Sequence, residues 1–109
     1  MKKLFQKKCI PCDSSTASLK TNEVETFLLE LGDDWQLIEQ QYLKREFKFP
    51  NFRIALDFAN KIGKIAEEEN HHPDIFLSWG KVEVKIWTHS INGLSENDFI
   101  LAAKISLIV

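Results

Sequence analysis

Hydrophobic spacing along this chain switches repeatedly between two periods, and the order of the switches restricts the folds open to it. Residues 21–31, 52–70 and 95–106 place apolar side chains three and four positions apart, which is the spacing of one buried helix face. Residues 35–49 and 74–89 instead alternate apolar and polar side chains, as strands with one wet face do. The predicted order is therefore α-β-β-α-β-β-α.

The two alternating segments are predicted to form two hairpins. The second consists of strands over 74–79 and 81–89 that join tightly at Gly80. Two hairpins separated by a helix can pair into one antiparallel sheet whose apolar face is covered by the helices. The fold class predicted is α+β, a four-stranded antiparallel sheet with three helices on one face and the other face open.

A single domain is expected, because 109 residues suit one core of ordinary size. Residues 1–20 lack apolar periodicity and are predicted to be a flexible N-terminal arm, with the domain spanning 21–109. Within the arm, Cys9 and Cys12 supply only two of the four ligands that a structural zinc requires. We expect them to be reduced and without a catalytic role.

Charge and hydropathy exclude several classes of function. The 14 basic and 16 acidic side chains give a net charge of −2, so the positive surface that drives nucleic-acid binding is missing overall. No apolar run approaches the roughly 20 residues of a membrane helix, and no signal-peptide core follows the basic first residues. We expect a cytoplasmic protein that binds neither nucleic acid nor membrane.

All three histidines of the chain fall between positions 71 and 89. His71 and His72 precede the first strand of the second hairpin and His89 ends the next strand, so the turn at Gly80 should bring them together. Imidazole both accepts and donates protons near neutral pH, and a pair of such groups suits an elimination reaction.

Two carboxylates are candidates for orienting these rings. Glu67 lies four residues before His71 and is expected to accept its ring N–H, and Asp98 could do likewise from the last helix. Asp98 is equally well explained as the capping partner of Ser95. A metal site formed by Glu67, His71 and His89 is an alternative, but the His-Glu-x-x-His pattern is absent, and we expect no metal.

Two tryptophans add flat apolar surface near the same hairpin. Trp79 shares its strand parity with Ile75 and Leu77, which favours a place in the core. Trp87 shares the polar face with Lys85 and is the better candidate for stacking against a planar ligand.

Apolar surface exceeds what one small sheet can cover. The long central helix carries a second apolar row, and the chain ends in four more apolar residues: Ile54, Phe58 and Ile65, then Ile105, Leu107, Ile108 and Val109. Large exposed apolar patches usually mark contact sites, so a homo-oligomer is predicted.

The histidine region resembles a family signature. It contains Glu67, three residues, His71-His72-Pro73, five residues, Trp79, nine residues, His89, eight residues and Asp98. This ordered spacing resembles that of pterin-4a-carbinolamine dehydratases, and the similarity extends over roughly residues 20–106.

The resemblance implies a substrate of the type 4a-hydroxytetrahydrobiopterin and a product of quinonoid dihydrobiopterin plus water, with no cofactor consumed. It implies that His71 and His89 are the catalytic acid and base, in an order left open, and that His72 chiefly holds the pterin. We expect Pro73 and Trp87 to contribute to substrate binding beside His72. Glu67 and Asp98 would then orient the rings.

The family further implies dimers or tetramers and a functional link to an aromatic amino acid hydroxylase. The alternative is a non-catalytic module that binds pterin or acts as a dimerisation cofactor in transcription. The complete histidine set favours the enzyme, because an interaction module does not need paired acid and base groups.

Overall fold

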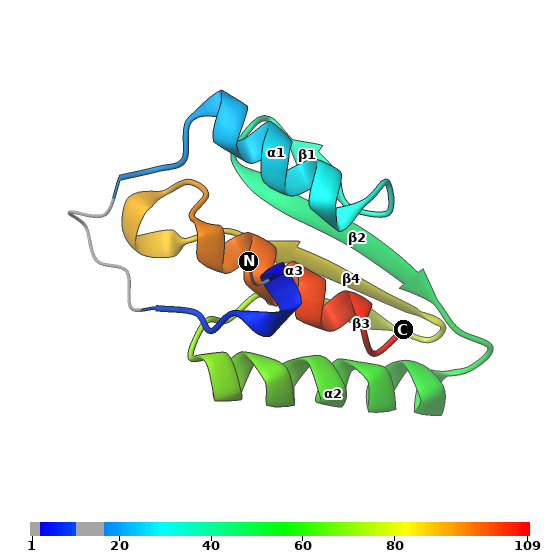
Figure 1. The fold of residues 1–109 in the computed structure, drawn as a ribbon. Helices are drawn as coiled ribbons and strands as arrows, with labels where there is room; N and C mark the ends of the chain where they lie inside the picture. The colour runs from blue at the N-terminus through cyan, green and yellow to red at the C-terminus, as the bar shows by residue number, and fades with distance from the viewer. Residues whose placement is uncertain (1–2, 11–16) are drawn as a thin grey trace.

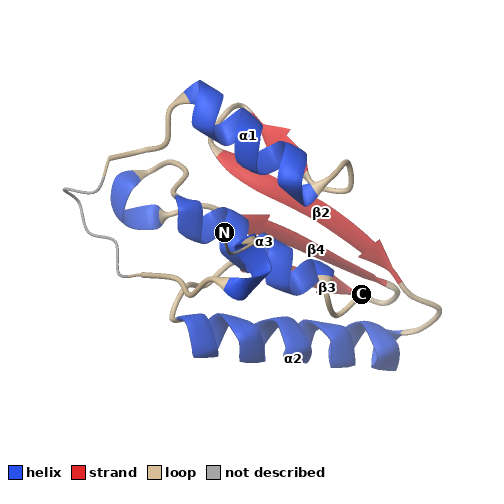
Figure 2. Ribbon diagram, viewed as in Figure 1, coloured by secondary structure: helices blue, strands red, loops and turns tan. Residues whose placement is uncertain are grey.

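The computed structural model describes residues 3–10 and 17–109 and confirms the predicted order of elements (Figures 1 and 2). There are also two short 3-10 turns, η1 (Leu4–Gln6) before the first helix and η2 (His89–Ile91) before the last one. The helices and strands are α1 (Thr21–Leu31), β1 (Gln36–Ile38), β2 (Tyr42–Lys48), α2 (Phe52–Glu69), β3 (Asp74–Ser78), β4 (Lys81–Ile86) and α3 (Glu96–Ser106). Among these described segments, no helix combines the length and the apolarity needed to cross a membrane.

All four strands form one antiparallel sheet in the order β1-β2-β4-β3. The two hairpins meet along β2 and β4, where Leu43 pairs with Ile86 at one end and Lys48 with Lys81 at the other. Because β4 lies between β2 and β3, its end leads directly from the centre of the sheet toward the start of β3. The predicted fold class, α+β with a four-stranded antiparallel sheet, is confirmed.

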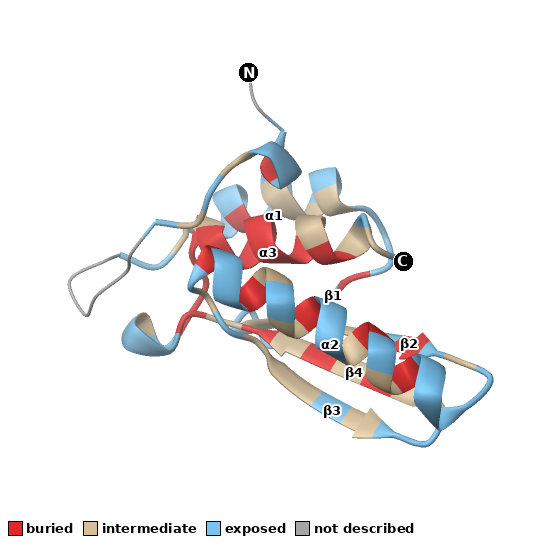
Figure 3. Ribbon diagram, turned by 90° about the horizontal axis from the view of Figure 1, so that it is seen from below, coloured by how far each residue is buried: buried red, intermediate tan, exposed pale blue. Residues whose placement is uncertain are grey.

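The three helices cover one face of this sheet (Figure 1). Val82, Val84 and Ile86 point toward the helices from β4 and are 0% exposed, as alternation in a half-buried strand requires. Buried residues concentrate on α3 and on the inner sides of α2 and β4 (Figure 3). α3 is thus the most enclosed helix, and the side chains at its start lie inside the protein.

The long helix α2 buries more of its surface than its sequence indicated. Phe58, assigned to an exposed second row, is 5% exposed and packs between Phe47 and Phe49 at ring-centroid distances of 4.7 and 5.0 Å. The aromatic side chains at the end of β2 therefore cover it. Ile54 does remain 42% exposed, so the apolar excess on α2 is smaller than predicted.

Residues 3–10 lie against the domain, a packing that the sequence did not predict. Leu4 is 1% exposed and belongs to the main core, although no periodic apolar pattern surrounds it in the sequence. The Cys9 backbone N–H donates to Glu69 at 2.9 Å, and the Ile10 N–H donates to Asn97 Oδ1 at 3.0 Å. This segment therefore connects the end of α2 with the start of α3.

Cys9 has a half-buried thiol in this connection. Burial, together with the nearby Glu69 carboxylate, raises the pKa of Cys9 to about 12, so the thiol stays protonated at neutral pH. Burial alone would raise the pKa of Glu69, but hydrogen bonds from Lys104 and from the Cys9 N–H lower it. Cys12 lies outside the described residues, so the prediction for the pair stays a prediction.

One local expectation, the place of Trp79 in the core, was wrong. Trp79 is 69% exposed and not in the core. It follows Ser78, the last paired residue of β3, so strand parity no longer applies to it.

Candidate functional site

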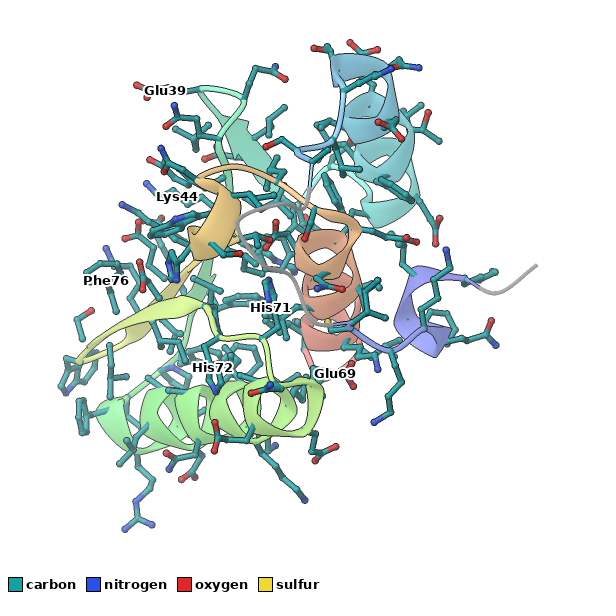
Figure 4. The ribbon with its side chains drawn as sticks, turned by 90° about the vertical axis from the view of Figure 1, so that its left-hand side faces the viewer. Glu39, Lys44, Glu69, His71, His72 and Phe76 are labelled. Carbon is teal, nitrogen blue, oxygen red and sulfur yellow. The ribbon has the colours of Figure 1, made fainter. Side chains whose placement is uncertain are left out.

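The end of α2 separates the two adjacent histidines. Asn70 adopts the left-handed conformation (φ 51°), and the next N–H, that of His71, returns to the Ala66 carbonyl at 3.1 Å. This is the hydrogen-bond pattern of a Schellman motif, which terminates a helix and redirects the chain. His71 is therefore directed toward α3, whereas His72 stays over the end of α2 (Figure 4).

His71 is held by a buried carboxylate. Its Nε2 lies 2.7 Å from Asp98 Oδ1, and the side chains of His71 and Asp98 are 12% and 0% exposed. An ionised carboxylate only accepts hydrogen bonds, so Nε2 is the donor, and in the neutral ring the lone pair is then on Nδ1. The geometry thus fixes both the orientation and the tautomer of His71.

The second oxygen of Asp98 is also fully used. Oδ2 accepts the Ser95 backbone N–H at 2.8 Å and the Thr88 hydroxyl at 2.9 Å. Since Thr88 donates to Asp98, the Ser95 hydroxyl, 2.7 Å from Thr88 Oγ1, must donate to Thr88. Asp98 therefore caps α3 and holds His71 at the same time, through different oxygens.

Glu67 pairs with a different histidine from the one expected. Its carboxylate contacts His72 Nε2 and not the His71 ring. The physical reason is the reversal at Asn70, which turns His71 away from the helix surface that Glu67 occupies. The Glu67 and His72 side chains are 78% and 54% exposed, so solvent surrounds this pair.

His89 reaches the site from the end of β4. Thr88 and Gly93 form an isolated antiparallel bridge, which closes a tight loop with η2 at its head and Asn92 in the left-handed conformation (φ 50°). The His89 ring stands edge-on to Trp87 at a centroid distance of 4.3 Å. Trp87 thus supports the exposed His89 ring from the side of the sheet.

One cleft of about 260 Å³ brings the three histidines together. The predicted residues His71, His72, His89 and Trp87 all line it, whereas Pro73 is not among its lining residues. The remaining lining residues were not identified from the sequence: Ile10, Asn70, Thr88, Ser90 and Asn97. Asn70, Thr88, Ser90 and Asn97 each adjoin a predicted site residue in sequence, but no sequence signal indicated Ile10.

Metal ligation finds no support in the described geometry. Residues 3–10 and 17–109 contain no group of three His, Cys, Asp or Glu side chains placed to hold an ion. Glu67, from the alternative metal set, is engaged with His72. What the cleft offers chemically is proton transfer by imidazole, beside an aromatic wall.

The fold and the site define a small α+β protein with a histidine-lined cleft at one end of its sheet. The family model described as pterin 4 alpha carbinolamine dehydratase matches residues 17–108. A Rickettsia canadensis protein is 57% identical over 102 residues, covering 94% of each chain, and one from Alkaliphilus metalliredigens is 50% identical over 105 residues, covering 96% of this chain and 95% of its own. Both relatives are provisionally named pterin-4-alpha-carbinolamine dehydratases. The chain belongs to the pterin-4a-carbinolamine dehydratase family.

Two solved structures resemble the structure of this chain. A Brucella melitensis protein described as a transcriptional coactivator/pterin dehydratase superposes with a TM-score of 0.76 at 33% identity, covering 84% of this chain and 98% of its own. A pterin dehydratase-like protein described as a RuBisCO assembly factor superposes with a TM-score of 0.59 at 19% identity, covering 72% of this chain and 92% of its own. The second similarity extends only to the fold.

Proposed function

We propose that this protein dehydrates 4a-hydroxytetrahydrobiopterin to quinonoid dihydrobiopterin. The observation that carries the proposal is the buried Asp98, which holds His71 in a single tautomer in the cleft that His89 also lines. An oriented imidazole opposite a second imidazole is the arrangement that general acid and base catalysis requires.

His71 is the proposed base. Its Nδ1 lone pair accepts the proton from the pterin ring N–H, and Asp98 stabilises the imidazolium that forms. His89, in its protonated form, donates a proton to the 4a-hydroxyl, whose C–O bond breaks to release water. The nitrogen electron pair forms the new C=N bond, and proton exchange with solvent restores both rings.

The pterin ring is proposed to bind against Trp87, which follows β4, with His72 contacting it from the segment that precedes β3. Both side chains line the cleft, and an indole face suits a planar heterocycle. Pro73 would act indirectly, since its fixed φ sets the path from His72 into β3.

A direct assay tests this proposal. Purified protein is mixed with 4a-hydroxypterin generated by a hydroxylase, and quinonoid dihydropterin formation is followed by absorbance above the spontaneous rate. We expect saturable acceleration that is unchanged after exhaustive chelation. A rate equal to the spontaneous one would contradict the proposal, and activity restored only by added zinc would replace it with a metal mechanism.

A non-catalytic role is the second candidate. Its support is that the Brucella melitensis protein, 33% identical to this chain, is described as a transcriptional coactivator as well as a pterin dehydratase. The intact set of His71, His72 and His89 in one cleft favours catalysis for this chain. Tight pterin binding without turnover would favour the second candidate.

The proposal has three further parts. The protein forms a homo-oligomer, it recycles pterin for an aromatic amino acid hydroxylase, and it is cytoplasmic. Exposed apolar side chains support the first of these: Phe52 and Ile54 on α2, and Leu107 and Val109 at the end of the chain. Sedimentation at micromolar concentration should show at least a dimer. A monomer would contradict this part alone.

A further inference from the structure

A second hollow lies beside the histidine cleft, on the open face of the sheet. Its volume is about 240 Å³, and its walls include Tyr42, Asp74, Phe76, Lys85 and Asn92. Trp87 lines both this hollow and the histidine cleft. Figure 4 shows Phe76 on the side of the sheet that faces away from α3, with His71 nearer to that helix.

Aromatic rings join the two hollows. Trp87 lies 4.3 Å from His89 on one side and 6.1 Å from Tyr42 on the other, measured between ring centroids. A planar ligand bound against Trp87 in the cleft would therefore direct a substituent along this row of rings toward Tyr42.

Lys85 is the distinctive cation of the second hollow. Its neighbours on the same face are paired, Lys44 with Glu83 at 3.2 Å and Lys81 with Glu46 at 3.6 Å. Lys85 makes no ion pair with any carboxylate in the described part of the chain. Its Nζ instead lies 5.3 Å from the Tyr42 ring and 5.5 Å from the Phe76 ring, which hold it at the hollow by cation–π attraction.

The polar groups of the hollow include both donors and acceptors. Lys85 supplies an ammonium, and Asp74, its partner across β3 and β4, supplies a carboxylate. Asn92 offers both kinds of group. A phosphate would meet the Asp74 charge, whereas hydroxyl groups can donate to the carboxylate and accept from the ammonium.

We infer that this hollow binds a hydroxylated side chain carried by the ring that occupies the histidine cleft. The inference rests on the proposed function and deepens it by assigning specificity for the substituent to Lys85 and Tyr42. A substrate with a short alkyl substituent would reach Trp87 but leave these polar groups hydrated.

The test compares two 4a-hydroxytetrahydropterins, one with a dihydroxypropyl and one with a methyl substituent at C6. The wild-type protein should prefer the diol in kcat/KM by about tenfold, and Lys85→Met should remove most of that preference by raising KM for the diol alone. Tyr42→Phe should remove a smaller part. Lys44→Met is the matched control, because Lys44 pairs with Lys85 across β2 and β4 but does not line the hollow.

Binding of unreactive dihydropterins with the same two substituents gives the comparison without turnover. A preserved preference in an inactive protein would contradict the dehydratase proposal but support the subsite. Equal binding of diol and methyl compounds by the wild type, or equal losses in Lys85→Met and Lys44→Met, would overturn the subsite. Tighter binding of a phosphorylated side chain than of the diol would overturn the assignment to hydroxyl groups.

Discussion

Two histidine–carboxylate pairs stand a few residues apart in this protein, and they differ in almost every physical respect. The His71–Asp98 pair is buried, with Asp98 at 0% exposure, while the His72–Glu67 pair is open to solvent, with Glu67 at 78%. Asp98 accepts three hydrogen bonds from three separate segments, whereas the hydrogen bond of Glu67 comes from a histidine five residues away.

This difference shows that the energetic contribution of a histidine–carboxylate pair depends more on its burial than on its presence. Exposed ion pairs are weakened by water and salt and typically contribute 0 to about 1 kcal/mol. A buried carboxylate must instead keep its partners, because an unsatisfied buried group costs about 1–3 kcal/mol or more. The buried pair therefore fixes geometry, and the exposed pair adjusts to its surroundings.

Replacing Asp98 with Asn should cause the largest effect on the buried pair. The amide no longer favours the His71 tautomer with its proton on Nε2, so we expect turnover to fall by about 10²–10⁴-fold. The capping bond to Ser95 is also disturbed, and the free energy of unfolding should drop by about 1–3 kcal/mol. Rapid-mixing kinetics and chemical denaturation measure the two effects, and normal turnover in a folded variant would disprove the role of Asp98.

Alanine substitution of each histidine separates catalysis from binding. His71→Ala and His89→Ala should each lose about 10²–10⁴-fold in kcat, since each removes one proton-transfer group. His72→Ala should mainly raise KM. Steady-state kinetics on folded variants measure this, and near-normal kcat in the first two would refute the acid and base assignment.

The variant Thr88→Val tests the hydrogen bond that Thr88 donates to Asp98 of the buried pair. The variant keeps the shape of the side chain but removes the hydroxyl that donates to Asp98 and that contacts the Ser95 hydroxyl. We expect a loss of about 1–2 kcal/mol in stability and a smaller loss of kcat than in the His71 variant. Thermal unfolding and kinetics on the same preparation provide the comparison. If kcat fell as far as in His71→Ala, Thr88 itself would have to take part in the reaction.

Glu67→Gln should have the smallest effect. Stability should change by less than about 0.5 kcal/mol and kcat by no more than a few-fold, because solvent already screens this pair. Raising the salt concentration should reproduce this small effect in the wild type while leaving the His71–Asp98 pair intact. A hundredfold loss of kcat in Glu67→Gln would show that the exposed pair is catalytic.

Periodicity was enough to predict the strands, the helices and the pairing of hairpins. Alternation in Val82, Val84 and Ile86 gave one buried face, and helical spacing placed α2 correctly. The errors occurred where one residue changes the direction of the chain. Because Asn70 is left-handed, Glu67 contacts His72 and not His71. The chain turns after Ser78, and Trp79 is therefore exposed.

The parts of the site that could not be predicted depend on tertiary contacts. Ile10 lines the cleft because its backbone pairs with Asn97, and no local pattern encodes a contact between such distant positions. Phe58 is covered because Phe47, near the end of β2, and Phe49, just after it, pack beside it. Spacing predicts which residues share a face, but it does not predict what lies opposite that face.

The double use of Asp98 has a consequence for how sequences of relatives should be interpreted. A descendant that gave up catalysis would still need this carboxylate to begin α3, so selection for folding alone would retain it. The same pressure does not act on His89, which is exposed and caps nothing. Retention of Asp98 is therefore weak evidence of an active relative, and the loss of His89 is the more informative sign that activity has been abandoned.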